Sequence, residues 1–354
     1  MNIYSDKNYL KSGNRHVVML YPFWGKNPED PHQPTSGRYD HYVSHGRGLF
    51  KMTSLEDSDI AVLPFPWEDT IGNPDMIAAA TDFTTRAVAA GKKVLLFYWH
   101  DLTDTVCLTN SVIFRTSLYA SHRKNNEFAM PAWSEDFVNC YLSGKVVERK
   151  KSIKPVVGFC GTAGPLHPPV KYRVKNIVKN IANTLGLGKY ELSRPLRARA
   201  LANLEADKSI RTNYLLRDRF LGVPATESAS ASPDMFRRLR IDYVKNMVES
   251  DYILCVRGAG NFSYRLYETL SCGRIPVLIN TDCSLPFDSL INYKDYFVWV
   301  EENDLAQIGE RVSEFHQRLS PDEFIDLQHN CRKLWESYLS PYGFFSHIHV
   351  HLRG

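Results

Sequence analysis

The residues best suited to chemistry form one short stretch, from Arg257 to Glu268, in the second half of the chain. A glycine loop follows Arg257, and Ser263 and Arg265 stand where a helix would begin. Free N–H groups at a helix start, with guanidinium and hydroxyl donors beside them, suit a phosphate group. Glu268 shares a helix face with Arg265, and its carboxylate can accept two sugar hydroxyls. The stretch predicts a diphosphate-sugar site made of Arg257, Gly258, Ser263, Tyr264, Arg265 and Glu268.

A simpler interpretation makes this stretch an ordinary strand-to-helix turn, in which Arg265 and Glu268 form a surface ion pair. The added arginines, the serine and the glutamate favour the binding site over that interpretation. The spacing differs from Gly-x-x-x-x-Gly-Lys-Ser/Thr and from Gly-x-Gly-x-x-Gly, so nucleoside triphosphate hydrolysis and dinucleotide redox chemistry are disfavoured.

The elements that position this site alternate between strands and helices. The pattern predicts strands at His16 to Tyr21, Ile60 to Phe65, Val94 to Trp99, Tyr252 to Val256, Arg274 to Ile279 and Tyr296 to Val300. It predicts helices at Pro74 to Ala90, Val170 to Leu185, Pro233 to Glu249, Asn303 to Leu319 and Pro321 to Leu339. Such alternation is typical of α/β domains with parallel sheets. The charged stretch from Arg149 to Pro155 is the expected hinge between two domains.

Several motifs in their order resemble the exostosin-like glycosyltransferases. They are the Arg257-Gly loop, Ser263-x-Arg265-x-x-Glu268, Gly273-x-Ile-Pro276-Val, Asp282 with Leu285-Pro-Phe287, Tyr296 to Glu301, and Val156 to Gly161 upstream. Together they cover most of residues 155–310. The resemblance implies a GT-B fold, with two Rossmann-like domains facing across a cleft. It also implies a nucleoside diphosphate sugar as donor, held mainly by the second domain.

In this arrangement residues 1–150 form the acceptor-binding domain and residues 151–325 the nucleotide-sugar-binding domain. Residues 326–354 are expected to cross back to the first domain as helices. The length of 354 residues is consistent with two domains, since a single one seldom grows so long.

Composition limits the class of protein. With 44% hydrophobic and 23% charged residues, the chain is neither disordered nor a membrane protein by composition. A net charge of +4 is mild, and no basic stripe with interleaved aromatics predicts nucleic-acid binding. The expected partners are a nucleotide sugar and a glycan acceptor; the sequence predicts no oligomeric state.

The expected location is the cytoplasm. The N-terminus lacks a hydrophobic segment, no run of 18 apolar residues occurs, and the seven cysteines include no Cys-x-x-Cys pair. Animal and plant exostosins, by contrast, resemble Golgi type II membrane proteins. A bacterial or viral member and a shortened form of a longer protein both stay open.

Glycosyl transfer with inversion needs a base that takes the proton of the acceptor hydroxyl. Asp101 follows the strand at Val94 to Trp99, where similar exostosin-like proteins carry an aromatic-x-Asp pattern, and is the preferred candidate. His100 and Asp104 are its competitors. A structural alternative makes Asp101 a helix cap or turn former.

The acceptor is expected at loops that follow the strands of the first domain, because ligands bind there in open α/β sheets. The candidates are Trp24, Trp67, Arg115 and Trp133. Alternatives stay open for two of them: Arg115 could meet the diphosphate instead or be a structural arginine paired with Glu127 or Asp136, and Trp133 could be a core tryptophan at a domain seam.

No metal site is predicted. His41 and His45 lack the glutamate of a His-Glu-x-x-His zinc helix, and the histidines near the C-terminus lack carboxylate or cysteine partners. No tightly bound cofactor is expected, while a divalent cation that helps the diphosphate leave is left open.

The sequence thus predicts an inverting transferase that moves a sugar from a nucleoside diphosphate to a glycan hydroxyl. Two alternatives remain: a retaining GT-B transferase, and a non-catalytic glycan- or nucleotide-binding protein of the same fold.

Overall fold

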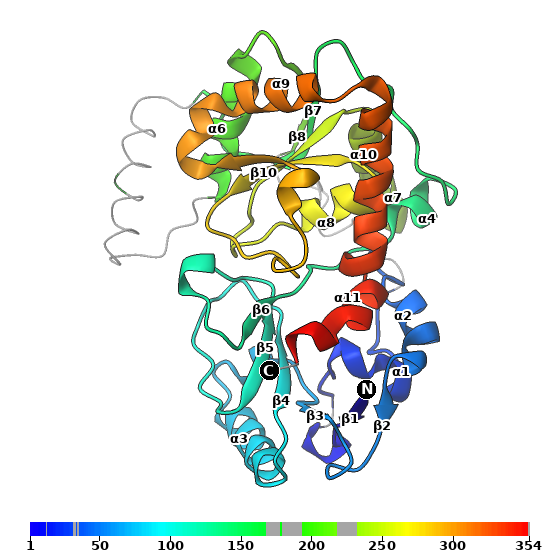
Figure 1. The fold of residues 1–354 in the computed structure, drawn as a ribbon, viewed down its shortest axis with the longest axis vertical. Coiled ribbons are helices and arrows are strands. Elements are labelled where there is room, and N and C mark those ends of the chain that lie inside the picture. The colour runs from blue at the N-terminus through cyan, green and yellow to red at the C-terminus, as the bar shows by residue number, and fades with distance from the viewer. Residues whose placement is uncertain are drawn as a thin grey trace.

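The computed structural model describes residues 1–11, 13–30, 33, 35–167, 178, 193–217 and 232–352. Figure 1 shows two α/β domains, one above the other, each built on its own sheet. Every strand pair within both sheets is parallel. The predicted architecture of two Rossmann-like domains is confirmed.

The N-terminal sheet has the strand order β2-β1-β3-β4-β5-β6. Its strands are β1 (Asn2–Tyr4), β2 (Lys51–Met52), β3 (Ile60–Val62), β4 (Val94–Tyr98), β5 (Ser111–Arg115) and β6 (Glu127–Ala129). All five residues of β4 and of β5 are buried, as expected for central strands of a parallel sheet covered on both faces. Helix α3 (Pro74–Ala89) begins at Asn73, whose side chain accepts a hydrogen bond from the Met76 amide.

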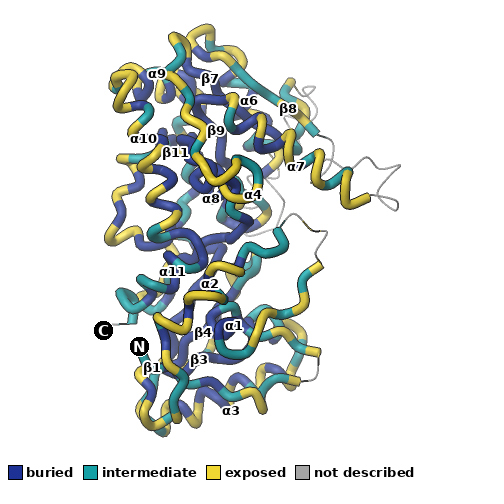
Figure 2. Tube along the Cα trace, turned by 90° about the vertical axis from the view of Figure 1, so that its right-hand side faces the viewer, coloured by how far each residue is buried: buried dark blue, intermediate teal, exposed yellow. Residues whose placement is uncertain are grey.

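The C-terminal sheet has the order β11-β10-β9-β7-β8. Its strands are β7 (Val156–Thr162), β8 (Arg211–Arg217), β9 (Tyr252–Cys255), β10 (Ile275–Asn280) and β11 (Val298–Glu301). The helices of this domain are α6 (Ser193–Ala206), α7 (Pro233–Val248), α8 (Tyr264–Ser271), α9 (Ile308–Arg318) and α10 (Pro321–Leu334). Figure 2 shows the strands as the buried centre and α9 with a largely exposed outer face. Because β9 is the middle strand, the loop after it lies at the centre of the sheet edge.

The chain returns to the N-terminal domain at its end. After a π-helical turn (Trp335–Leu339), helix α11 (Pro341–His347) packs against α2 (Asp40–His45), as Figure 1 shows. The ring of Phe345 stacks on that of Tyr42 with centroids 4.4 Å apart. A 3-10 turn (Ile348–His351) follows.

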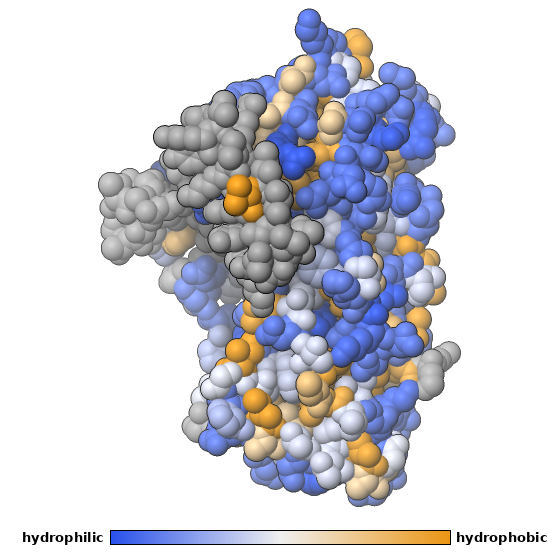
Figure 3. Space-filling model, turned by 90° about the vertical axis from the view of Figure 1, so that its left-hand side faces the viewer, coloured by the Kyte–Doolittle hydropathy of each residue, from blue (hydrophilic) through white to orange (hydrophobic). Residues whose placement is uncertain are grey.

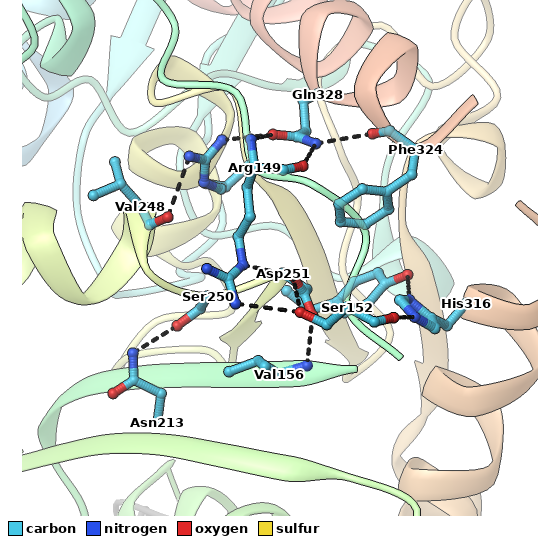
Figure 4. A network of polar contacts seen from close by, with 12 residues as sticks. Arg149, Ser152, Val156, Asn213, Val248, Ser250, Asp251, His316, Phe324 and Gln328 are labelled. Atoms are coloured by element: carbon cyan, nitrogen blue, oxygen red, sulfur yellow. Dashed lines mark hydrogen bonds and ion pairs between the residues drawn. The ribbon is translucent and has the colours of Figure 1, made fainter. Parts of the chain in front are cut away.

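The segment between the domains is fastened to the C-terminal one (Figure 4). Buried Asp251 accepts hydrogen bonds from Arg149 Nε at 2.5 Å, from Ser152 Oγ at 3.2 Å and from the Val156 amide at 2.8 Å. Gln328 of α10 also bonds both backbone groups of Arg149 at 2.9 Å. The stretch expected as a hinge is therefore packed as part of the C-terminal domain.

One predicted strand is wrong. Instead of a strand at His16 to Tyr21, the chain forms a 3-10 turn (Val18–Leu20) and the short helix α1 (Tyr21–Trp24). Pro22 explains the difference, because its fixed φ suits a first helical turn and its missing N–H would interrupt a sheet. The first strand is Asn2–Tyr4, and the helix expected at 170–185 lies outside the described residues.

The distribution of hydrophobic residues on the surface is consistent with the moderate hydrophobic content of the sequence. On the face in Figure 3, hydrophobic residues are scattered among hydrophilic ones over the coloured part of the molecule. No helix within the described ranges is long and apolar enough to cross a bilayer.

Candidate functional site

The loop between β9 and α8 is built as the sequence predicts. The Gly258 amide donates to the Phe262 carbonyl at 2.8 Å and closes the turn. Ser263 then takes the extended cap position before the first residue of α8, Tyr264. The free amides of α8 therefore point toward the sheet edge, where the two domains meet.

Gly260 allows the two domains to touch. A Cβ at this position would lie 2.8 Å from Asp101 Oδ1 and 2.9 Å from Asp101 Cα, closer than side chains pack. Asp101 follows β4, so the end of this N-terminal strand lies directly against the glycine loop. The base candidate and the predicted phosphate loop are thus neighbours.

Asn261 provides a second contact between the glycine loop and the N-terminal domain. Its backbone amide donates to Ser117 Oγ at 2.9 Å, and its side-chain Nδ2 donates to the Leu118 carbonyl at 3.4 Å. Because Asn261 is buried, this contact is part of the domain interface.

A cavity of about 680 Å³ opens between the domains at this point, and we call it the arginine cavity. Among the described residues its lining includes six arginines and two carboxylates: Arg38, Arg194, Arg197, Arg217, Arg240 and Arg265, with Asp101 and Glu268. The volume lies within the range of roughly 300–1,000 Å³ that is usual for small-molecule sites. Among the described lining residues arginines thus outnumber carboxylates, which suits a ligand with several negative charges.

Arg265 is held rigidly at the wall of this cavity. Its Nη2 donates to the Cys160 carbonyl at 2.7 Å, and its guanidinium lies 4.2 Å from the centre of the Phe159 ring. Gly161 makes room for it: the backbone there has φ +151°, and a Cβ would lie 2.7 Å from Nη2. The fork of donors is therefore preorganised.

Glu268 lines the cavity within a buried network. One oxygen accepts from Arg240 Nη2 at 2.6 Å and the other from Tyr243 Oη at 2.5 Å. Arg240 also donates to Glu135 at 2.6 Å. Burial alone would lower the pKa of Arg240, but the carboxylates of Glu268 and Glu135 outweigh it and raise this pKa well above its usual value. These two hydrogen bonds use two of the about four acceptor positions of the Glu268 carboxylate, so the others can accept from a ligand. The contacts of Glu268 with ribose hydroxyls stay a prediction.

The structure brings most predicted donor residues together. Gly258, Ser263, Tyr264, Arg265 and Glu268 all line the arginine cavity. Arg257 is outside its lining and donates to Tyr119 Oη of the N-terminal domain at 2.7 Å.

The other candidates for the base lie apart from the cavity lining. His100 accepts from the Leu102 amide at 3.0 Å, and the Asp104 carbonyl accepts from Arg115 Nη2 at 3.0 Å. Of the three candidates, only Asp101 lines the arginine cavity.

Two predicted acceptor residues are interior side chains. Arg115 is 3% exposed and pairs with Glu127 at 2.9 Å, because a buried guanidinium needs a carboxylate partner. Its expected place in the cleft is wrong, and the structural alternative holds. Trp133 is 1% exposed and packs edge-on against Phe344 with centroids 5.5 Å apart, but it also lines a smaller cavity beside the arginine cavity.

Trp24 and Trp67 do not line the arginine cavity, so their expected place in the cleft is not observed. Trp24 lies beside His16, with centroids 5.5 Å apart, and Trp67 packs on the core around α3.

Sequence reasoning missed Arg240, and the diphosphate site that it predicted also leaves out the arginines of α6 and β8 that line the cavity. Arg197 donates to the carbonyls of Thr162 at 2.8 Å and Arg257 at 3.0 Å, which places it beside the glycine loop. A signal for Arg240 was present: it falls on the apolar face of α7, between Phe236 and Tyr243. A charged residue on such a face needs a buried partner.

Within the described ranges, no group of three or more His, Cys, Asp and Glu side chains is placed to hold a metal ion. The expectation about metals and cofactors stays a prediction.

Comparisons with known proteins agree with the motif. Residues 193–315 match the family model of the Exostosin GT47 domain. Over 99 residues the chain is 32% identical to exostosin-1 of Drosophila melanogaster, a match that covers 28% of this chain and 12% of that protein. Over 67 residues it is 37% identical to a probable glucuronosyltransferase of Oryza sativa subsp. japonica, which covers 19% of this chain and 16% of that protein. The match thus spans a small part of each relative's length.

Among solved structures, a glycosyltransferase from Rickettsia africae aligns over 92% of this chain and 82% of that chain, with 11% identity. The TM-score of 0.36 is too low to support a conclusion about fold or function. The residues that match the Exostosin GT47 family model run from α6 to α9, and they include the whole of the glycine loop after β9 and of helix α8, which line the arginine cavity. The resemblance of this chain to the exostosin-like glycosyltransferases is therefore confirmed.

Proposed function

We propose that this chain is an inverting glycosyltransferase, which takes a sugar from a nucleoside diphosphate donor and gives it to a glycan hydroxyl. The observation that carries the proposal is the arginine cavity, which opens at the start of α8 inside the region that resembles exostosins. Its positive charge suits a diphosphate, and the α8 amides add donors for the same group.

In this proposal Arg265 and Ser263 bind the diphosphate, with Tyr264 and Gly258 shaping the site, and Glu268 contacts the ribose. Arg257 joins them by exchanging its hydrogen bond to Tyr119 for one to a phosphate oxygen.

Asp101 acts as the base. It takes the proton of the acceptor hydroxyl while that oxygen attacks the anomeric carbon and the bond to the phosphate oxygen breaks. The electron pair of the broken bond leaves with the nucleoside diphosphate, whose added charge the arginines stabilise. The proposal includes no tightly bound cofactor, and a divalent cation accompanying the donor would add to the same stabilisation.

A cytoplasmic setting is also proposed. All seven cysteines are free thiols in the structure, which is typical of proteins in a reducing compartment.

Thermal-shift measurements with UDP-, GDP-, dTDP- and CMP-sugars test the donor assignment. A ligand that binds the folded state raises its stability with the logarithm of concentration, so the true donor nucleotide should stand out. If no UDP-, GDP- or dTDP-sugar shifts the melting temperature at millimolar concentration, or if only a CMP-sugar, which carries a single phosphate, does so, the donor proposal fails.

The reaction itself is tested with Asp101→Asn. We expect the variant to keep the donor-induced shift and to lose transfer; an active variant would move the base role to His100 or Asp104. The anomeric configuration of the product, read by NMR, distinguishes inversion from the retaining alternative. A protein that binds donor but never turns it over would instead be the non-catalytic alternative.

A further inference from the structure

A second cavity lies next to the arginine cavity, on the N-terminal side of the interface. It has a volume of about 360 Å³. We call it the aromatic cavity, because seven aromatic side chains line it among the described residues: Tyr21, Tyr39, Phe97, Trp99, Trp133, Tyr264 and Phe345. Its volume is at the small end of the usual range for ligand sites, which suits a short ligand.

The two cavities share Arg38 and Tyr264. Tyr264 is the first residue of α8, and its hydroxyl accepts a hydrogen bond from the Trp99 indole at 2.9 Å. The guanidinium of Arg38 lies 4.9 Å from the Tyr39 ring centre and 5.3 Å from that of Trp99. A ligand in the aromatic cavity would therefore border a donor bound in the arginine cavity.

The aromatic cavity also carries polar groups at its edge. Asn27, Glu29 and Glu68 line it together with Arg15. Flat apolar rings with a few hydrogen-bonding groups beside them match a sugar ring, which has an apolar C–H face and a rim of hydroxyls.

Glu68 is the group best placed for those hydroxyls. It stands on a short 3-10 helix (Trp67–Thr70), and its side chain is only 8% exposed. One oxygen accepts from the Trp99 amide at 3.0 Å, and the other pairs with Arg15 at 3.0 Å. Each oxygen keeps a further acceptor position. Burial raises the pKa of Glu68 to about 7, against the lowering effects of Arg15 and the Trp99 amide, so this carboxylate is short of solvation.

We propose that the aromatic cavity holds one sugar ring of the glycan acceptor, with Glu68 accepting hydrogen bonds from its hydroxyls. This inference rests on the proposed glycosyl transfer. Asp101, which lines the neighbouring cavity, receives the proton, whereas Glu68 binds and orients the acceptor.

The test uses the full chain and a panel of p-nitrophenyl monosaccharides: glucoside, galactoside, xyloside, N-acetylglucosaminide and glucuronide. Binding is followed by saturation-transfer NMR, and nucleotide binding by thermal shift on the same samples. We expect at least one glycoside to bind the wild type and Glu68→Gln to weaken it tenfold or more, with nucleotide binding unchanged. Glu56→Gln, the same change at an exposed position of the same domain, should alter neither.

A second variant covers the case in which Glu68→Gln does not fold. Val18 lines the aromatic cavity and is half-buried, so Val18→Trp should fill the space and block glycoside binding while nucleotides still bind. Failure of all glycosides to bind, or binding that both variants leave intact, would overturn the inference even if nucleotides bind. Absence of nucleotide binding would instead count against the proposed function.

Discussion

The arginine cavity and the aromatic cavity share a wall but differ in charge and in how their residues are spread along the chain. Much of the arginine cavity comes from the loop and helix after β9 and from the helices around it, within the C-terminal domain. The aromatic cavity gathers residues from Arg15 to Phe345, through both domains and the returning helix. A charged group such as a diphosphate can be bound by a compact local motif, whereas a neutral ring needs walls on several sides.

The largest expected effect concerns the buried network of the arginine cavity. Arg240→Ala leaves Glu135 and Glu268 without their cation in the interior. Breaking one side of such a buried pair costs about 3–5 kcal/mol of unfolding free energy. Urea denaturation of the variant and the wild type measures this loss of unfolding free energy.

The matched control is Arg237→Ala on the same helix, because Arg237 is exposed and its loss should change stability by no more than about 0.5 kcal/mol. Equal effects of the two variants would contradict the assigned network.

The next effect concerns the aromatic cavity and depends on pH. The folded-state pKa of Glu68 is raised by burial to about 7, from an ordinary value of 4.5, with Arg15 opposing and Asp69 adding to the shift. A carboxylate with a raised pKa costs the folded state stability as pH rises from 4.5 through 7. Glu68→Gln has no charge to bury, so its stability relative to wild type should increase by up to about 3 kcal/mol between pH 5 and pH 8.

Chemical denaturation of both proteins at these two pH values measures the change. A difference that stays constant, or one that falls with pH, would show that Glu68 is not a buried carboxylate of this kind.

A smaller effect is expected where the domains touch. Gly260→Ala places a methyl group against Asp101 and Phe262, and such crowding costs about 1–3 kcal/mol. Gly258→Ala is the control in the same loop, because its nearest neighbour would be the Phe262 carbonyl at 3.8 Å, an ordinary contact. Thermal unfolding compares the two, and equal stability would mean that the loop and Asp101 are not in contact.

The smallest effect is at the rim of the interface. Arg123 pairs with Asp288 across the domains at 2.6 Å, with about a third of each side chain exposed. Because solvent screens such a pair, it contributes about 1 kcal/mol or less to the unfolding free energy. Arg123→Ala should therefore lower the unfolding free energy only slightly, and a loss of several kcal/mol would show that this rim contact holds the domains together.

Sequence reasoning succeeded where the information is local. The strand, glycine loop and helix from Tyr252 to Glu268 are predictable because glycines, an extended cap and an apolar strand act within a few residues. The alternation of strands and helices also predicts two parallel sheets.

The misses share a different physical cause. One partner of Arg240, Glu135, lies more than a hundred residues away, and no short window of sequence contains such a pair. For Arg115 the sequence already offered Glu127 as a partner, but it did not show that their two strands lie side by side in the sheet, which turns the arginine inward. The error at His16 to Tyr21 arose from hydrophobic content alone, which does not separate a buried strand from a buried turn.

One measurement tests the central claim most directly: isothermal titration of UDP, GDP and dTDP into wild type, Arg265→Ala and Arg237→Ala. Since hydrogen bonds to charged groups are worth about 1.5–3 kcal/mol, the account predicts that one diphosphate binds wild type with a 1:1 ratio and that Arg265→Ala weakens it by about 10- to 150-fold. Arg237→Ala should bind it like wild type. If no diphosphate binds wild type, or if Arg265→Ala binds one as tightly as wild type does, the arginine cavity is not the donor site.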